Sequence, residues 1–420
     1  MANEQAERNL DISVMSKVHA PIRYAFYAFI MAIPFETAYT DTVTIVGTIP
    51  LLIGIAFVGV ALLQPRICFA PPPGAFWCFA GYVFAYVILG TTQTPMYADP
   101  MFSRLLTLIQ MLVLLWISYN LFKYPEICKG ALLAFAASCT IESMLLIFGI
   151  GTESAKQGRT TMFADNPNSV GIILALGVVA LTGITHGRMT VEKKMALLAW
   201  TCVAVMGIAL VMTGSRGALL GLVSGLAVLV LKKGSAGTKL KAGLIALSVI
   251  AFLVWASYTN EGMRTRWENT LYEGDVAGRD SIVPQAWAMF LEKPVLGWGP
   301  VTNRFELGNR VGLPSRDTHN VYLAVLIETG LFGAIPFFAG LWFSLRSAWR
   351  ALSGREGALP MAMLVCLLII NLSGTMHASK TFWLLIAYAL ASAWSFRQVS
   401  QHQPVRFSDT LASRGSGTSP

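Results

Sequence analysis

Residues 320–345 read NVYLAVLIETGLFGAIPFFAGLWFSL and contain one charged residue, Glu328. A helix that crosses the hydrocarbon core of a membrane needs about 20 predominantly apolar residues. This stretch is longer than that, so it predicts a membrane-spanning helix. Three Gly, one Pro and several aromatic residues interrupt the aliphatic run, and Gly and Pro are more frequent in membrane helices than in soluble ones.

The rest of the chain extends this prediction. Of its 420 residues, 55% are hydrophobic and only 13% are charged, whereas a soluble domain carries about 25% charged residues. That composition excludes a soluble globular enzyme and a disordered protein. We therefore predict an all-α polytopic membrane protein with about twelve spanning helices. The predicted spans are 22–36, 42–63, 75–91, 102–122, 128–150, 168–186, 195–212, 216–231, 242–258, 320–345, 358–374 and 381–397.

The distribution of Lys and Arg predicts the orientation. With both termini in the cytoplasm, nineteen Lys and Arg fall on the inner side and five in the short outer loops, as the positive-inside rule requires. The net charge of +9 is then a consequence of topology, and nucleic-acid binding needs no further consideration. We expect five regions: a cytoplasmic tail (1–21), spans one to nine (22–258), a large outer loop (259–319), spans ten to twelve (320–397) and a disordered cytoplasmic tail (398–420).

The large outer loop is expected to be ordered and functional, since loops of this length usually are functional or disordered and this one is rich in aromatic residues. Residues 280–292 (DSIVPQAWAMFLE) have apolar side chains at spacings of three and four, including Trp287, which predicts a helix with one apolar face. Asp280 or Ser281 is its expected N-cap. Such a helix lies on the membrane surface or roofs a cavity; simple packing on the bundle is the alternative.

Arg216, in the segment TGSRG, precedes the eighth span on the outer side. Gly214 and Gly217 flank it and allow backbone to approach a ligand, and the start of a helix adds N–H groups and a positive dipole. We expect an anion site here, with an arginine that reaches the lipid headgroups as the alternative. Further outward-facing candidates are Arg159, Arg264, Arg266 and Arg279. Arginine suits phosphate because its planar fork binds two oxygens at once.

His319 stands in RDTHNVYL, at the expected first turn of the tenth span, with Asp317 or Thr318 as the cap. A helix N-terminus disfavours the imidazolium, so His319 is expected to be neutral near pH 7, the form that a general base requires. Asp317 is the alternative base, and a purely capping His is the alternative without chemistry. The chain has no Walker A, HExxH or GxSxG motif, and its six cysteines form no CxxC pair that would indicate a metal site.

These residues resemble the bacterial O-antigen ligase family within the wider ligase and polymerase superfamily. The resemblance lies in R-x3-L at Arg216 and Leu220, in H-x10-G at His319 and Gly330, and in the stretch between them. That stretch holds Gly278–Arg279, an aromatic-rich helix and P-x-x-G-x-G at Pro294, Gly297 and Gly299. The layout of twelve spans with one large loop before the tenth is also similar, and it implies a fold like that of the GT-C membrane glycosyltransferases.

The resemblance implies a metal-independent, inverting glycosyltransferase without cofactors in the bacterial inner membrane. It would transfer a glycan from undecaprenyl pyrophosphate to lipid A–core on the periplasmic side, during lipopolysaccharide biosynthesis. His319 would be the base, Arg216 and Arg279 would hold the pyrophosphate, and Arg159 is a weaker candidate for that role. Trp287, Asp317, Arg264 and Arg266 would support the site. An O-antigen polymerase, an O-linked oligosaccharyltransferase and, more distantly, a transporter are the alternative functions.

Overall fold

The structure is a computed structural model, and it is mostly helical. It describes residues 18–36, 45–155, 158–163, 165–186, 193–231, 236–272, 274, 278–354 and 356–401. Most of the two predicted cytoplasmic tails, 1–21 and 398–420, lies outside these residues. Their predicted location therefore stays a prediction.

Each of the twelve predicted spans coincides with a helix. Ten of these helices differ from the predicted bounds by only a few residues at each end, as expected for apolar runs that end at polar residues or glycine. The helices are α2 (Ala20–Ala32, followed by the 3-10 turn η1, Ile33–Phe35), α3 (Ile45–Ala61), α5 (Gly74–Gln93), α6 (Ala98–Phe122), α7 (Pro125–Ile147), α8 (Pro167–His186), α9 (Lys193–Met212), α10 (Arg216–Leu231), α11 (Ala236–Thr259), α15 (Val321–Ala351), α16 (Leu359–Ile370) and α17 (Lys380–Gln401).

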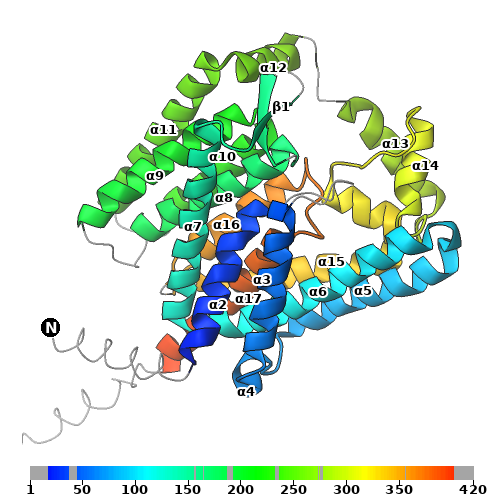
Figure 1. Cartoon of the computed structure of the whole chain (residues 1–420), viewed down its shortest axis with the longest axis horizontal. Coiled ribbons are helices and arrows are strands. Elements are labelled where there is room, and N and C mark those ends of the chain that lie inside the picture. Colours follow the sequence, from blue (N-terminus) through cyan, green and yellow to red (C-terminus); the bar gives the residue numbers. More distant parts are fainter. Residues whose placement is uncertain are drawn as a thin grey trace, which may run out of the picture.

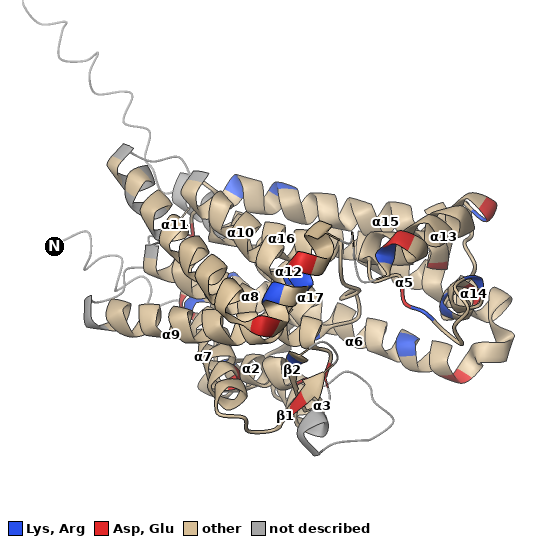
Figure 2. Ribbon diagram, turned by 90° about the horizontal axis from the view of Figure 1, so that it is seen from above, with Lys and Arg blue, Asp and Glu red and all other residues tan. Residues whose placement is uncertain are grey.

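Within the described residues, six helices are long and apolar enough to cross a membrane, and five more apolar helices are shorter. The chain is thus consistent with a polytopic membrane protein, and the count of twelve crossings stays a prediction. Figure 2 shows the apolar composition of the bundle: most of its ribbon carries neither acidic nor basic residues.

The bundle packs around α15. This helix lies against α5 and α17, while α10 lies between α8 and α16. Aromatic rings fill the centre: Phe337 of α15 meets Phe79 and Tyr82 of α5 and Phe382 of α17 at ring-centroid distances of 5.1–6.2 Å. All four side chains are fully buried, and edge-on, tilted and stacked aromatic contacts of this kind add to the stabilisation that burial gives.

The large loop between α11 and α15 contains three helices: α12 (Glu261–Tyr272), α13 (Arg279–Glu292) and α14 (Thr302–Arg310). The predicted helix over 280–292 is therefore present. A short antiparallel hairpin, β1 (Thr152–Ala155) and β2 (Arg159–Met162), joins α7 to α8; it adds two strands to the expected all-α fold. Figure 1 shows α12 and β1 at the top of the bundle and α13 and α14 at its right-hand side, near α15.

α15 is broken at Gly330, which has φ +56° and ψ −161° inside the helix. The loop that follows α13 fills the break. Leu331 and Phe332 donate their N–H groups to the carbonyls of Pro294 and Val295, at 2.8 and 3.0 Å. These are backbone groups that a helix break leaves without helical partners, and burial requires that they find others.

Two glycines make this close approach possible. A Cβ atom on Gly297 would lie 2.7 Å from the Gly330 nitrogen, and a Cβ on Gly330 would collide with the Val295 carbonyl. Both residues also have positive φ, a conformation that side chains disfavour. The glycines of P-x-x-G-x-G and H-x10-G therefore meet at one junction, which fixes the loop after α13 against the helix that follows His319.

Candidate active site

Arg216 is the first residue of α10, as the sequence predicted. Its Nη1 donates to the Arg266 carbonyl at 3.0 Å, which joins α10 to α12. The adjacent Gly217 packs directly against the Ser373 side chain, between α16 and α17. The glycine at this position thus brings another part of the protein close to Arg216.

Arg159 is the first residue of β2 and lies beside Arg216. Its Nε donates to the Thr213 carbonyl at 2.9 Å, and its Nη2 donates to Asn168 Oδ1 at 2.7 Å. Burial lowers the pKa of Arg159 to about 10, and the nearby charges of Arg266 and Arg216 add to this effect. Three guanidinium groups are therefore gathered here, from the first residues of α10 and β2 and the middle of α12.

Arg279 is the first residue of α13. The N-cap is Gly278, with φ +74° and no side-chain cap, so the expected cap at Asp280 or Ser281 was wrong; a left-handed glycine sets the entry to the helix instead. Arg279 Nη2 donates to the Ser373 carbonyl at 3.1 Å, and Ser373 is the residue that Gly217 contacts. Burial and the charge of Arg216 lower the pKa of Arg279.

Arg216 and Arg279 thus approach each other from two sides of Ser373. The Nε of Arg279 is buried and has no hydrogen-bond partner within the described residues. A buried guanidinium nitrogen without a partner, beside another cation, is costly. An anion that binds between them would remove part of this cost.

His319 immediately precedes the α15 N-cap and has φ +48°, a conformation that is uncommon for a residue with a side chain and often found at functional sites. The cap of α15 is Asn320, whose Oδ1 accepts from the N–H groups of Tyr322 and Leu323. The expectation that Asp317 or Thr318 caps this helix was therefore wrong. Asp317 Oδ1 instead accepts the N–H of His319 at 2.8 Å, which holds the turn that presents the imidazole.

The pKa of His319 is lowered, chiefly by burial. Arg316, Arg279 and Arg304 lower it further, while Asp317 opposes them. A lowered pKa favours the neutral imidazole near pH 7, the form that was predicted, with burial and neighbouring arginines as the causes. In the part of the chain that the structure describes, neither ring nitrogen makes a hydrogen bond, so the ring is available to a substrate.

Asp317 is held as a carboxylate. Burial alone would raise its pKa, but Arg304 and hydrogen bonds from Thr375 Oγ1 and the His319 N–H lower it to about 2. The Arg304 ion pair measures 2.9 Å and the Thr375 hydrogen bond 2.6 Å. A carboxylate with so low a pKa is a weak base, and its contacts fit a role in orienting His319.

Sequence reasoning missed Arg304, Arg316, Ser373 and Thr375. Arg316 and Arg304 act on the same imidazole, and the Arg316 side chain lies near Gly278. Arg316 is adjacent to the Asp317–His319 segment in sequence, which was an available signal. Arg304, Ser373 and Thr375 come from other parts of the chain, and the sequence gives no indication of their proximity.

Two predicted residues point away from this cluster. Arg264 is half exposed and pairs with Glu268 at 2.8 Å along α12, whereas Arg266, two residues on, is only 8% exposed. Trp287 is 47% exposed and packs on Phe290. The buried residues of α13 are Ile282, Ala286 and Met289, so Trp287 lies beside the packed face of this helix and not within it.

The site therefore combines cations that suit a multiply charged anion with a neutral imidazole next to a fixed carboxylate. Figure 2 shows basic residues on α12 and on α13. Comparison with curated proteins gives no significant match. Residues 201–338 match the family model described as O-antigen ligase, and this segment contains Arg216, Arg279 and His319. This segment, about a third of the chain, is therefore similar to the O-antigen ligase family.

Proposed function

We propose that this protein transfers a glycan from undecaprenyl pyrophosphate to a sugar hydroxyl of lipid A–core. The observation that carries the proposal is the convergence of Arg216, Arg279 and His319, which are far apart in sequence. The charge of Arg216 acts on Arg279, and the charge of Arg279 acts on His319. A pyrophosphate between the arginines would then lie near a neutral base.

The reaction follows from this arrangement. The acceptor hydroxyl oxygen attacks the anomeric carbon of the donor glycan as its proton passes to a ring nitrogen of His319. The bond from the anomeric carbon to the pyrophosphate oxygen breaks, and the pyrophosphate leaves with the electron pair. Attack opposite the leaving group inverts the anomeric centre. Positioned base catalysis of this kind contributes about 10²–10⁴-fold in rate.

Arg216 and Arg279 would stabilise the negative charge that grows on the leaving pyrophosphate. Loss of one such electrostatic contact typically lowers the rate by about 10²–10³-fold. The interactions of Arg159 with Thr213 and Asn168 make it a support for this part of the site, and the backbone carbonyl of Arg266 positions Arg216. We assign Arg264 no contact with the donor, since it faces outward.

Asp317 would act through His319 and not as the base itself. It fixes the backbone of the His319 turn and stabilises the imidazolium that forms during transfer. Trp287 would cover the site only if α13 moves, because its ring is half exposed in this structure. If Trp287→Ala leaves the ratio of glycan transfer to donor hydrolysis unchanged, Trp287 has no role in the mechanism.

The proposed location is the bacterial inner membrane, with the site at the periplasmic face and both termini in the cytoplasm. The contacts of Gly217 and Arg279 with the same residue, Ser373, support a single active face. Because both substrates carry lipids, a site at the membrane surface lets each arrive by lateral diffusion.

The test is transfer by the purified protein in detergent, without added metal or nucleotide. Labelled polyprenyl-pyrophosphate glycan is offered with lipid A–core or with a second portion of itself. We expect label on lipid A–core, donor binding without transfer for His319→Ala, and weaker donor binding for Arg216→Ala. Lengthening of the polyprenyl-linked glycan alone would instead make the protein a polymerase. Near-normal transfer by His319→Ala would refute the mechanism.

A further inference from the structure

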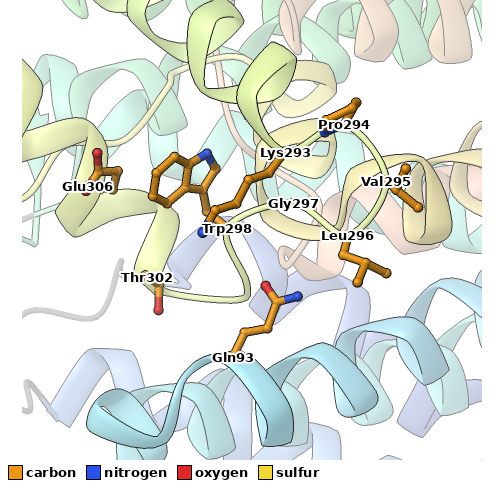
Figure 3. Close-up of a pocket in the computed structure, with 9 residues that line it drawn as sticks. All are labelled: Gln93, Lys293, Pro294, Val295, Leu296, Gly297, Trp298, Thr302 and Glu306. Atoms are coloured by element: carbon orange, nitrogen blue, oxygen red, sulfur yellow. The ribbon is translucent and has the colours of Figure 1, made fainter.

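A cavity of about 590 Å³ lies at the C-terminal end of α13. Figure 3 shows its walls: Gln93 at the end of α5, the loop Lys293–Trp298, and Thr302 and Glu306 of α14. The volume falls in the range of pockets that bind small ligands. None of these lining residues takes part in the mechanism proposed above.

The cavity wall combines a fixed aromatic ring with polar groups that have no partner. Trp298 Nε1 donates to the Met289 carbonyl at 2.9 Å, which holds the indole in place. The Lys293 ammonium lies 3.8 Å from the centroid of this ring. The Thr302 hydroxyl is buried and makes no hydrogen bond within the described residues.

Gln93 and Lys293 also offer unused hydrogen-bonding capacity. The Gln93 amide makes no hydrogen bond to the described part of the chain, and Lys293 has no carboxylate within ion-pair distance there. An amide donates and accepts, a hydroxyl donates and accepts, and an ammonium donates. This mixture, around an aromatic ring, matches a sugar, which has many hydroxyl groups and apolar C–H faces.

The cavity lies at the opposite end of α13 from Arg279. Arg279 begins α13 and the cavity follows its last residue, so a helix of about 20 Å separates the cavity from the pyrophosphate-binding arginines. α14 links the cavity to the base instead. Thr302 and Glu306 line the cavity, and Arg304 on the same helix pairs with Asp317 at 2.9 Å. An inverting displacement likewise needs the attacking hydroxyl and the leaving pyrophosphate on opposite sides of the reacting carbon.

We propose that this cavity binds a sugar residue of the acceptor glycan, remote from the hydroxyl that reacts. The inference rests on the proposed function for the identity of the acceptor. Contacts with a part of a substrate that does not react raise affinity and orient the reacting group. The cavity would thus select acceptors by a sugar that takes no part in the chemistry.

A membrane lipid tail is the competing occupant, because Val295 and Leu296 expose apolar side chains at the cavity. A tail, however, would leave Gln93 and Thr302 without hydrogen-bond partners and would leave Lys293 with only its contact with the Trp298 ring. Variants that remove only these polar groups therefore separate the two occupants.

The experiment compares Gln93→Ala, Lys293→Gln and Thr302→Val with Asn309→Ala as the matched control. Asn309 is exposed on α14 and does not line the cavity. Steady-state transfer is measured at saturating donor with lipid A–core and with a synthetic acceptor that contains only the reacting sugar. Each cavity variant should raise KM for lipid A–core by about 3- to 10-fold, the effect of one hydrogen bond. We expect kcat, the donor KM and the KM of the short acceptor to stay unchanged.

Three results would overturn the inference: an unchanged KM for lipid A–core, a raised donor KM, or an equal rise for the short acceptor. Binding of the free core oligosaccharide, measured without donor, separates this inference from the proposed function. The wild-type protein could transfer no glycan and yet bind the oligosaccharide more tightly than Thr302→Val does. In that case the proposed function fails and the cavity assignment holds. Equal binding by wild type and all three variants refutes the cavity assignment.

Discussion

Replacing Asp317 by Asn removes one charge while it keeps the size of the side chain and an oxygen that can accept the His319 N–H. The variant thereby separates the two possible roles of Asp317. If Asp317 only positions His319, its replacement should slow transfer without abolishing it. As the base, it is indispensable, because an amide cannot take up the proton.

The expected cost in stability follows from the pKa of Asp317. It lies at about 2, compared with an ordinary value of 3.8, and this difference corresponds to about 2.4 kcal/mol in favour of the carboxylate at neutral pH. Arg304 is 47% exposed, and solvent screening of the pair makes this an upper figure. Because the pKa is lowered in the folded state, the stabilisation is complete above pH 3.8 and is lost as the pH falls toward 2.

The expected effect on transfer concerns His319. Asp317 raises the pKa of His319 against the opposing effects of burial and three arginines. Without the carboxylate, that pKa falls further, so the acid limb of the profile of kcat/KM against pH should move to lower pH. Transfer at neutral pH should slow, but by less than the 10²–10⁴-fold that loss of a general base causes.

The assay is kcat/KM for glycan transfer between about pH 5 and 8, the range in which histidine titrates, together with thermal unfolding in detergent at neutral and acidic pH. His319→Ala is the reference for complete loss of the base. If Asp317→Asn abolishes transfer at every pH while the protein stays folded, Asp317 is the base and our assignment is refuted. If its stability equals that of the wild type at neutral pH, the ion pair with Arg304 contributes nothing and the reasoning on its pKa fails.

Three further predictions concern other parts of the site. Wild-type kcat/KM should be constant near pH 7 and fall only below about pH 6.5, because the lowered pKa of His319 keeps it neutral; a fall that begins above pH 7 would contradict this. Arg279→Ala should lower the rate of transfer by about 10²–10³-fold. Arg264→Ala should change the rate of transfer by less than about twofold and the free energy of unfolding by less than about 1 kcal/mol. Equal losses of transfer by the two variants, assayed in parallel, would contradict the placement of the two residues. Gly330→Ala should destabilise the protein by at least about 1–3 kcal/mol, since its Cβ would collide with Val295; an unchanged thermal midpoint would show that the junction can relax.

Helix positions could be predicted where polarity changes sharply along the chain. Arg216 begins a helix, as expected, because an apolar run follows a short polar segment. The helix predicted over 280–292 is also present, although it begins at Arg279 and not after Asp280 or Ser281. The α15 cap was missed because Asp317, Thr318 and Asn320 are all good N-caps before the same apolar run. Only the tertiary contacts of Asp317, with Arg304 and Thr375, assign it another role and leave the cap to Asn320.

The break in α15 could not be predicted from hydropathy. The sequence through Gly330 stays apolar, so periodicity indicates one continuous helix. The break exists because the loop Pro294–Gly297 supplies carbonyl partners to Leu331 and Phe332, and this loop lies more than thirty residues earlier in the chain. The hairpin β1–β2 was missed for a related reason, since strands of four residues carry too little alternation to recognise.

The junction at Gly330 connects the two halves of the proposed chemistry. The same loop that fills the break continues from α13, which begins at Arg279, and leads into α14, which provides Arg304 to Asp317. The helix that it breaks begins directly after His319. A shift of this loop would therefore move the pyrophosphate-binding arginine, the carboxylate partner and the base together, and would reshape the cavity that Trp298 and Thr302 line. This coupling explains why two glycine patterns as different as P-x-x-G-x-G and H-x10-G occur in one domain: each provides one side of a single backbone contact.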